Sequence, residues 1–301
     1  MGMRSRPESE FPSLVSTEWL AERLGDPEYR VVDGSWYLPA DRRDAAAEYA
    51  AAHIPGAVFF DLDASSDRAT SLPHMLPPAA EFAARMSALG LDDASAIVVY
   101  DGSGVNLSAP RVWWTFRAFG HRRVAVLDGG FGKWRAEGRP VESGIPAPAP
   151  GRFTARLDPS VVRDLEAMRR NLSTHREQVV DARPAERFRG GTPEPRPGVR
   201  SGHIPGSLNL PYAELVAPDG TLLPPDRLRA RLEAAGVDLS RPIVATCGSG
   251  TSACALVLAL HVLGHEQVAL YDGSWTEWGS RSDTPIELGP PHRPPPPPSR
   301  P

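Results

Sequence analysis

Four short sequence blocks occur twice in this chain, in the same order and at nearly the same spacing. The offset between the two copies lies between 144 residues (272 − 128) and 150 residues (204 − 54). A repeat of this length is a whole domain and not a solenoid unit, so the chain is predicted to hold two copies of one fold. The paired blocks are Val31-Val-Asp33 with Val179-Val-Asp181, Ala52-His-Ile-Pro-Gly56 with Gly202-His-Ile-Pro-Gly206, Ile97–Asp101 with Ile243–Cys247, and Asp128-Gly-Gly-Phe131 with Asp272-Gly-Ser-Trp275.

Strand and helix patterns alternate within each copy. In the first copy, short apolar runs at 29–33, 96–101 and 123–128 are typical of strands, and a turn at 52–57 leads into another strand. Helices are predicted at 16–24, 79–89 and 110–119, where apolar residues have helical spacing. Each half is therefore predicted to be α/β, with a mainly parallel sheet flanked by helices.

Proline-rich sequence marks the boundaries of the two halves. The run 139–151 is typical of an extended linker, and the polyproline run that begins at Pro290 is typical of a disordered tail. The predicted layout is a flexible N-terminus over 1–11, a first domain over 12–140, a linker over 141–158, a second domain over 159–288 and a disordered Pro-rich tail over 289–301.

Charge and cysteine content narrow the function classes. A net charge of −4 argues against nucleic acid or an anionic membrane as the main partner. The longest apolar run, 253–263, is too short to span a bilayer. Two cysteines cannot form a disulfide framework, and no secretory signal is visible, so a reducing compartment, the cytoplasm, is expected.

The segment around Cys247 carries the strongest chemical signal. A predicted strand at 243–246 and a predicted helix at 252–263 flank a loop with two glycines. A curled loop at a helix N-terminus presents N–H groups to an anion, so we expect the Cys247 thiol to have a lowered pKa and to be partly thiolate. The alternative is a buried core cysteine at a strand end. Asp101 occupies the equivalent place in the first copy.

Over about residues 12–288, these blocks resemble the rhodanese sulfurtransferases. The resemblance implies two tandem rhodanese-like domains, of which only the second is catalytic. It also implies that Cys247 becomes a persulfide and passes its outer sulfur to cyanide, a small thiol or thioredoxin. An aspartate cannot carry sulfur, so the first domain, with Asp101, is expected to be non-catalytic.

The loop sequence points to the sulfur donor. Thiosulfate-using members of the family resemble Cys-Arg-Lys-Gly-Val-Thr-Ala, and 3-mercaptopyruvate-using members resemble Cys-Gly-Ser-Gly-Val-Thr-Ala. This chain has Cys247-Gly248-Ser249-Gly250-Thr251-Ser252-Ala253, which is similar to the second kind except that Thr-Ser replaces Val-Thr. A dianion such as thiosulfate would be better served by a cationic loop. Gly248, Gly250, Thr251 and Ser252 are therefore expected to line the donor site.

The resemblance also implies roles for residues outside the loop. Arg187 and Arg196 align with the pair that holds the substrate's carboxylate and carbonyl, a task suited to a planar guanidinium. Arg183 and Arg189 are expected to be solvated surface residues. The family pattern implies a relay from Asp63 through His74 to Ser249, which orients or deprotonates the serine hydroxyl.

Taken together, the residues predict a sulfurtransferase that moves sulfur from 3-mercaptopyruvate through a Cys247 persulfide and releases pyruvate. No metal cluster or other cofactor is implied, and Cys254 is expected to pack in the core. The alternatives are a thiosulfate:cyanide sulfurtransferase and a non-catalytic rhodanese binding module. A cysteine-dependent phosphatase is disfavoured, because Ala253 stands where such enzymes need an arginine.

Overall fold

The computed structural model describes residues 11–291. The flexible N-terminus and the Pro-rich tail predicted from the sequence therefore lie almost wholly outside the described residues. No helix within 11–291 is long and apolar enough to cross a bilayer.

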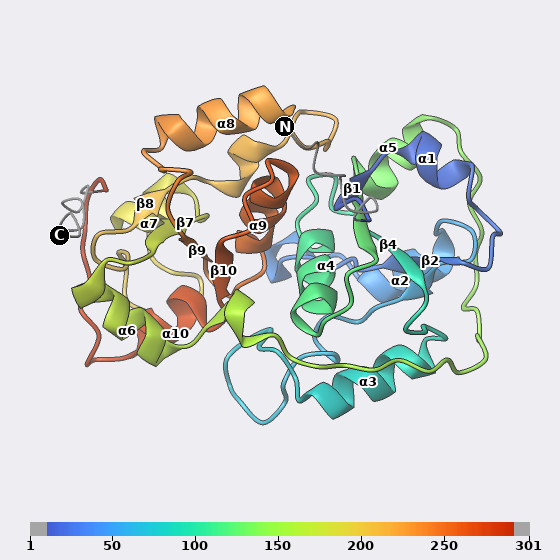
Figure 1. The fold of residues 1–301 in the computed structure, drawn as a ribbon, viewed down its shortest axis with the longest axis horizontal. Coiled ribbons are helices and arrows are strands. Elements are labelled where there is room, and N and C mark those ends of the chain that lie inside the picture. The colour runs from blue at the N-terminus through green and yellow to red at the C-terminus, as the bar shows by residue number, and fades with distance from the viewer. Residues whose placement is uncertain (1–10, 292–301) are drawn as a thin grey trace, which may run out of the picture.

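The secondary structure repeats in the order that the duplicated blocks predict (Figure 1). The first half contains β1 (Leu14–Val15), α1 (Thr17–Ala21), β2 (Tyr29–Asp33), η1 (Pro39–Asp41), α2 (Ala45–Ala51), β3 (Val58–Phe59), α3 (Ala79–Ala88), β4 (Ala96–Tyr100), α4 (Ala109–Ala118), β5 (Val124–Leu127) and α5 (Gly130–Ala136). The second half contains η2 (Pro159–Val161), β6 (Val162–Arg163), α6 (Leu165–Thr174), β7 (Gln178–Asp181), α7 (Ala185–Arg189), β8 (Leu208–Asn209), η3 (Tyr212–Leu215), α8 (Pro225–Ala234), β9 (Ile243–Thr246), α9 (Ala253–Val262), β10 (Val268–Tyr271) and α10 (Ser274–Ser280).

Each half forms one five-stranded parallel sheet, which confirms the predicted fold class. The strand orders are β1-β5-β4-β2-β3 and β6-β10-β9-β7-β8, so every strand has its counterpart in the other sheet. The register is repeated as well, because Asp33 pairs with Tyr100 and Asp181 pairs with Thr246. Strands β4 and β9 are buried along their whole length. Uniform burial explains their unbroken apolar sequence, since parallel sheets are covered on both faces.

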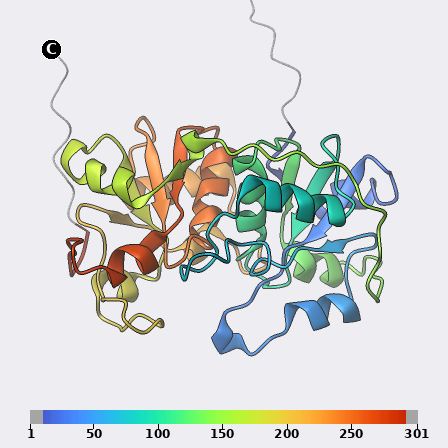
Figure 2. The same cartoon turned by 90° about the horizontal axis from the view of Figure 1, so that it is seen from below.

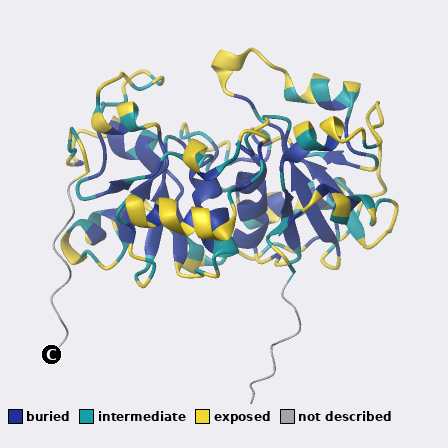
Figure 3. Cartoon of the chain, turned by 90° about the horizontal axis from the view of Figure 1, so that it is seen from above, coloured by how far each residue is buried: buried dark blue, intermediate teal, exposed yellow. Residues whose placement is uncertain are grey.

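The two halves meet through α4 and α9, which lie side by side at the centre of the molecule (Figures 1 and 3). Helix α9 is apolar on all sides because it is enclosed by its own sheet and by α4. One hydrophobic cluster extends across this interface and includes Val112 and Leu256. The Trp113 and His261 rings meet edge to face with centroids 5.3 Å apart. The interface fixes how the two domains sit on each other.

The segment 141–158 is extended, and it is attached to the first half (Figure 2). The backbones of Glu142 and His53 exchange two hydrogen bonds. Phe153 is buried, with its ring centroid 5.8 Å from that of Phe82. This contact set makes the segment a strap on the first domain and not a free tether.

Each half also sends a loop across to the other half. The Leu76 N–H, from the first half, donates to Asp272 Oδ2 of the second half at 2.8 Å. The Leu222 N–H, from the second half, donates to Asp128 Oδ1 of the first half at 2.8 Å. These bonds are equivalent under the duplication, because 222 − 76 and 272 − 128 differ by only two residues. Two reciprocal arms therefore tie the domains together.

The tips of the two arms share an unusual backbone conformation. His74 has φ 61° and Gly220 has φ 80°, and both are two residues before the bonded leucine. Few non-glycine residues adopt this left-handed conformation. The second arm uses glycine there, whereas the first arm places a histidine in the loop of the other domain.

Candidate active site

The loop that begins at Cys247 lies at the carboxyl end of β9, directly before α9. The junction of β10 and α10 supports the loop backbone from one side. The carbonyl of Cys247 accepts a hydrogen bond from the Trp275 N–H at 2.9 Å. The carbonyl of Gly248 accepts from the N–H and the hydroxyl of Thr276, at 2.9 and 2.6 Å. The Cys247 side chain is therefore held in place, and it is only 1% exposed.

The two copies of this loop differ in what fills them. In the first copy the carboxylate of Asp101 accepts hydrogen bonds from the N–H groups of Ser103, Ser108 and Ala109, at 2.8 to 2.9 Å. In the second copy, the N–H groups of residues 248–252 donate to no other residue within 11–291. The first loop is thus occupied by its own anion, while the second is open to a ligand anion.

The closeness of the loop to its neighbours requires glycine at position 250, and it places Gly248 against a flexible arginine side chain. Gly250 has φ 76°, and a Cβ there would lie 2.9 Å from Arg111 Nη1. A Cβ on Gly248 would lie 3.2 Å from Arg187 Nη2. The Arg187 guanidinium therefore stands beside the loop, as the family pattern implies for a substrate-holding arginine.

The structure brings Asp63, His74 and Ser249 together across the domain interface. His74 Nε2 is 3.2 Å from Asp63 Oδ1, and His74 Nδ1 is 3.1 Å from Ser249 Oγ. The hydrogen bond with His74 lowers the pKa of Asp63, against the opposing effect of partial burial. Trp36 completes the group: its Nε1–H donates to Asp63 Oδ2 at 3.1 Å, and its ring meets the His74 ring edge to face. Sequence reasoning missed Trp36, because no local pattern connects it to the second domain.

Arg187 and Arg196 differ in their partners. Arg187, on α7, is half-buried, and its guanidinium donates to the buried carboxylate of Glu194. Arg196 is also half-buried, but its guanidinium makes no hydrogen bond or ion pair with another residue in the described range 11–291. Burial and the nearby charge of Arg187 lower the pKa of Arg196. Both effects would be relieved by an anion bound between the two arginines.

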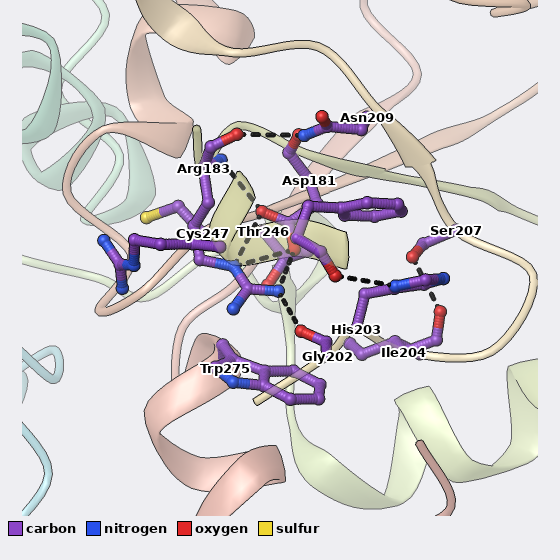
Figure 4. Close-up of polar contacts among 12 residues, drawn as sticks. Asp181, Arg183, Gly202, His203, Ile204, Ser207, Asn209, Thr246, Cys247 and Trp275 are labelled. Atoms are coloured by element: carbon purple, nitrogen blue, oxygen red, sulfur yellow. Dashed lines mark hydrogen bonds and ion pairs between the residues drawn. The ribbon is translucent and has the colours of Figure 1, made fainter. Parts of the chain in front are cut away.

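Arg183 is not a surface residue, so that prediction is wrong. It is 1% exposed and forms ion pairs with Asp181 at 2.7 Å and with Glu194 at 2.8 Å. Figure 4 shows it directed towards Asp181 and the carbonyl of Gly202, above the ring of Trp275. The physical reason is that the carboxylate which ends β7 is buried and needs a cation. Glu194 also pairs with Arg187, so Arg183 helps to hold Arg187 in place by fixing the carboxylate that both arginines contact.

Arg189, by contrast, is exposed, as predicted, and among residues 11–291 its side chain pairs only with the nearby Glu186, at 3.2 Å.

Arg111 is the main residue that sequence reasoning missed. It comes from α4 in the first domain and is 1% exposed. Its Nη1 lies 2.8 Å from Asp272 Oδ1 and donates to the Gly250 carbonyl at 3.3 Å, while Nη2 donates to the His74 carbonyl. Burial opposes its charge, but the Asp272 carboxylate, together with Cys254 and Cys247, more than offsets this effect and raises the pKa of Arg111. An arginine between the apolar residues Ala109 and Val112–Trp114 of the interface helix was the available signal.

The remaining loop residues have modest roles in the described structure. Ser252 is at the N-cap of α9 without a side-chain capping bond. Cys254 is fully buried, its thiol donates to the Gly250 carbonyl at 3.2 Å, and burial raises its pKa far above the ordinary value. This burial agrees with a packing role for Cys254.

Within residues 11–291, no three His, Cys, Asp or Glu side chains converge in a way that could hold a metal. A cavity of about 670 Å³ opens near Pro242 and Val268, at the opposite end of β9 and β10 from Cys247, and is not part of this site.

Comparison with known proteins agrees with this description. The sequence profile of the rhodanese-like domain family matches residues 16–137 and 164–281. The 3-mercaptopyruvate sulfurtransferase of Rattus norvegicus is 48% identical over 277 residues, which cover 90% of this chain and 93% of that protein. The thiosulfate sulfurtransferase of Bos taurus is 46% identical over 278 residues, with the same coverage.

A solved structure extends the agreement to three dimensions. The crystal structure of SseA from Escherichia coli, described there with the rhodanese fold and the mechanism of 3-mercaptopyruvate sulfotransferases, superimposes with a TM-score of 0.81. Its sequence is 40% identical, and the match covers 88% of this chain and 99% of that one. This chain therefore belongs to the rhodanese-like family and carries two copies of its domain.

Proposed function

We propose that this protein is a sulfurtransferase that takes sulfur from 3-mercaptopyruvate and forms a persulfide on Cys247. The observation that carries the proposal is the position of Cys247 in an open, glycine-lined loop beside Arg187 and opposite the His74 arm. The loop supplies backbone dipoles for an anionic sulfur. The arginines supply charge for a carboxylate.

In the proposed reaction, the Cys247 thiolate attacks the sulfur of 3-mercaptopyruvate. The S–S bond forms as the C–S bond breaks, and the electron pair of that bond goes to the carbon next to the carbonyl. The product is the enolate of pyruvate, which takes a proton, and Cys247 is left as a persulfide. Cyanide, a small thiol or thioredoxin then removes the outer sulfur and restores the thiolate. In this scheme Asp63 and His74 orient Ser249, whose hydroxyl takes the proton of the donor's thiol and passes it to the enolate, so that Cys247 is left as a persulfide anion.

Overall sequence identity does not distinguish the two donors, because relatives named for each donor are almost equally similar to this chain. Two local features favour mercaptopyruvate. Gly248 and Ser249 bring no cation into the loop, and Arg196 is a half-buried cation whose guanidinium has no hydrogen bond or ion pair among the described residues. A carboxylate outside the loop would satisfy Arg196. The direct test compares pyruvate release from 3-mercaptopyruvate with thiocyanate formation from thiosulfate and cyanide, as kcat/KM for each donor.

The arginine pair leads to a first prediction. Arg187→Ala and Arg196→Ala are each expected to lower kcat/KM for 3-mercaptopyruvate by about ten- to a hundredfold, since a charge-assisted hydrogen bond contributes roughly 1.5–3 kcal/mol. Arg189→Ala is the matched control, because Arg189 is exposed and pairs only with Glu186. Equal losses at 187 and 189 would mean that the arginines are wrongly assigned.

Loop charge leads to a second prediction. Gly248→Arg with Ser249→Lys places two cations beside Cys247, and the new side chain at 248 crowds Arg187, whose Nη2 would be 3.2 Å from its Cβ. The two cations should attract the thiosulfate dianion more strongly, and the crowding of Arg187 should weaken binding of the mercaptopyruvate carboxylate. The ratio of mercaptopyruvate to thiosulfate kcat/KM is expected to fall at least about tenfold, roughly 1.4 kcal/mol. An unchanged ratio, measured at one pH and salt, would show that loop charge does not set the donor.

We also propose that the protein works in a reducing compartment, the cytoplasm, because the persulfide cycle needs a free thiol. Both cysteines are unpaired in the described structure. A relative from Arabidopsis thaliana is named as mitochondrial, so fractionation of cells that produce the full chain is the test.

A further inference from the structure

Two hydroxyl groups, and not one, face the same nitrogen of His74. Thr251 Oγ1 is 2.9 Å from His74 Nδ1, and Ser249 Oγ is 3.1 Å from it. All three side chains are buried, with 4, 8 and 4% exposure for Thr251, Ser249 and His74. Water therefore has little access to this nitrogen, and its hydrogen bonding is decided by these two residues.

The chemistry of the ring allows only one of them to serve at a time. His74 Nε2 faces the Asp63 carboxylate at 3.2 Å, so in the neutral ring the proton belongs on Nε2. Nδ1 then has a single in-plane lone pair, which accepts one strong hydrogen bond. At any moment only one of Thr251 and Ser249 can therefore be its strong donor.

We propose that Thr251 is a positioning residue that takes over His74 Nδ1 when the Ser249 hydroxyl turns towards the reacting sulfur. The exchange keeps the ring orientation and its Nε2–H tautomer fixed while Ser249 is in use. Valine, which the resembling loops carry at this position, has the same shape and no hydroxyl. The second hydroxyl is thus a property of this chain. The proposal rests on the proposed function only for the role given to Ser249.

The hydrogen bond is tested first without any substrate. The full-length protein with ¹⁵N-labelled histidine is compared as wild type, Thr251→Val, Ser249→Ala and the double variant. Each single variant keeps one donor, so the His74 Nδ1 resonance is expected to stay that of an acceptor nitrogen with Nε2 protonated. In the double variant it should move to the position of a nitrogen without a donor. An Nδ1 resonance that moves fully in Ser249→Ala alone would overturn the proposal.

Kinetics then test the function of the exchange. Proton transfer by a positioned group contributes about 10²–10⁴-fold, so Ser249→Ala, which removes the hydroxyl that exchanges the proton, is expected to lose at least about a hundredfold in kcat/KM. Thr251→Val keeps that hydroxyl and removes only the group that holds His74, so it should lose less than about tenfold, and Thr251→Ser should match the wild-type rate. Because Thr251 acts only through Ser249, the double variant should lose no more than Ser249→Ala does. Losses that simply multiply would show that the two hydroxyls act independently.

The NMR and kinetic experiments distinguish failure of this proposal from failure of the proposed function. If 3-mercaptopyruvate is not a donor, the proposed function fails, but the NMR comparison still decides the hydrogen bond. If mercaptopyruvate is turned over and the NMR resonance does not respond to the double variant, the role of Thr251 fails alone.

Discussion

Cys247→Ser is expected to abolish sulfur transfer from every donor and to leave both domains folded. A hydroxyl is close in size to a thiol, and the loop backbone around residue 247 is held by Trp275 and Thr276 and not by the sulfur. A serine oxygen cannot hold a second sulfur as a persulfide does, so the covalent intermediate is lost. Intact-mass spectrometry after treatment with donor should show one added sulfur atom on the wild type and none on the variant.

Cys254→Ser is the matched control for this experiment. Cys254 is the other cysteine of the chain, it is fully buried in α9, and its raised pKa keeps the thiol protonated. A serine there can still donate to the Gly250 carbonyl, so sulfuration and turnover should persist. Sulfuration of Cys247→Ser, or loss of it in Cys254→Ser, would move the nucleophile to Cys254.

The sequence was sufficient to predict the duplicated α/β fold and the loop that follows β9. Buried parallel strands and their connecting loops leave local patterns, and the duplication made each pattern appear twice. Cys247 was identified for the same reason: it ends an apolar strand and begins a glycine-containing loop. These features are local, so they can be read without knowing how the domains pack.

What the sequence did not reveal depends on contacts between distant segments. Arg111 and Asp272 are in different domains, and only the packing of α4 on α9 brings them within 2.8 Å. The equivalence of His74 and Gly220 is one of backbone conformation, with φ 61° and 80°, and the sequence around them shares only a leucine and a proline, two and four residues on. Arg183 was misplaced because burial of the strand-ending Asp181 cannot be seen from composition alone.

The Arg111–Asp272 pair leads to the last prediction, which concerns stability. Arg111→Met is expected to lower the free energy of unfolding by about 3–5 kcal/mol, because it leaves the Asp272 carboxylate buried without its cation. The side chains of the pair are 1% and 5% exposed, so water cannot replace the missing partner. Since folded domains are stable by only about 5–15 kcal/mol, such a loss is large. Urea unfolding followed by tryptophan fluorescence measures it as a lower midpoint.

Two further variants distinguish the buried pair from ordinary surface charge. Arg122→Met removes an arginine that is 51% exposed and pairs with Asp158 at 3.2 Å, so it should change stability by less than about 1 kcal/mol. Arg111→Met combined with Asp272→Asn removes both charges and should recover part of the loss. If Arg111→Met unfolds at the same urea concentration as Arg122→Met, the pair does not hold the domains together. If it unfolds early, the arginine that donates to the carbonyls of His74 and Gly250 also stabilises the interface between the domains.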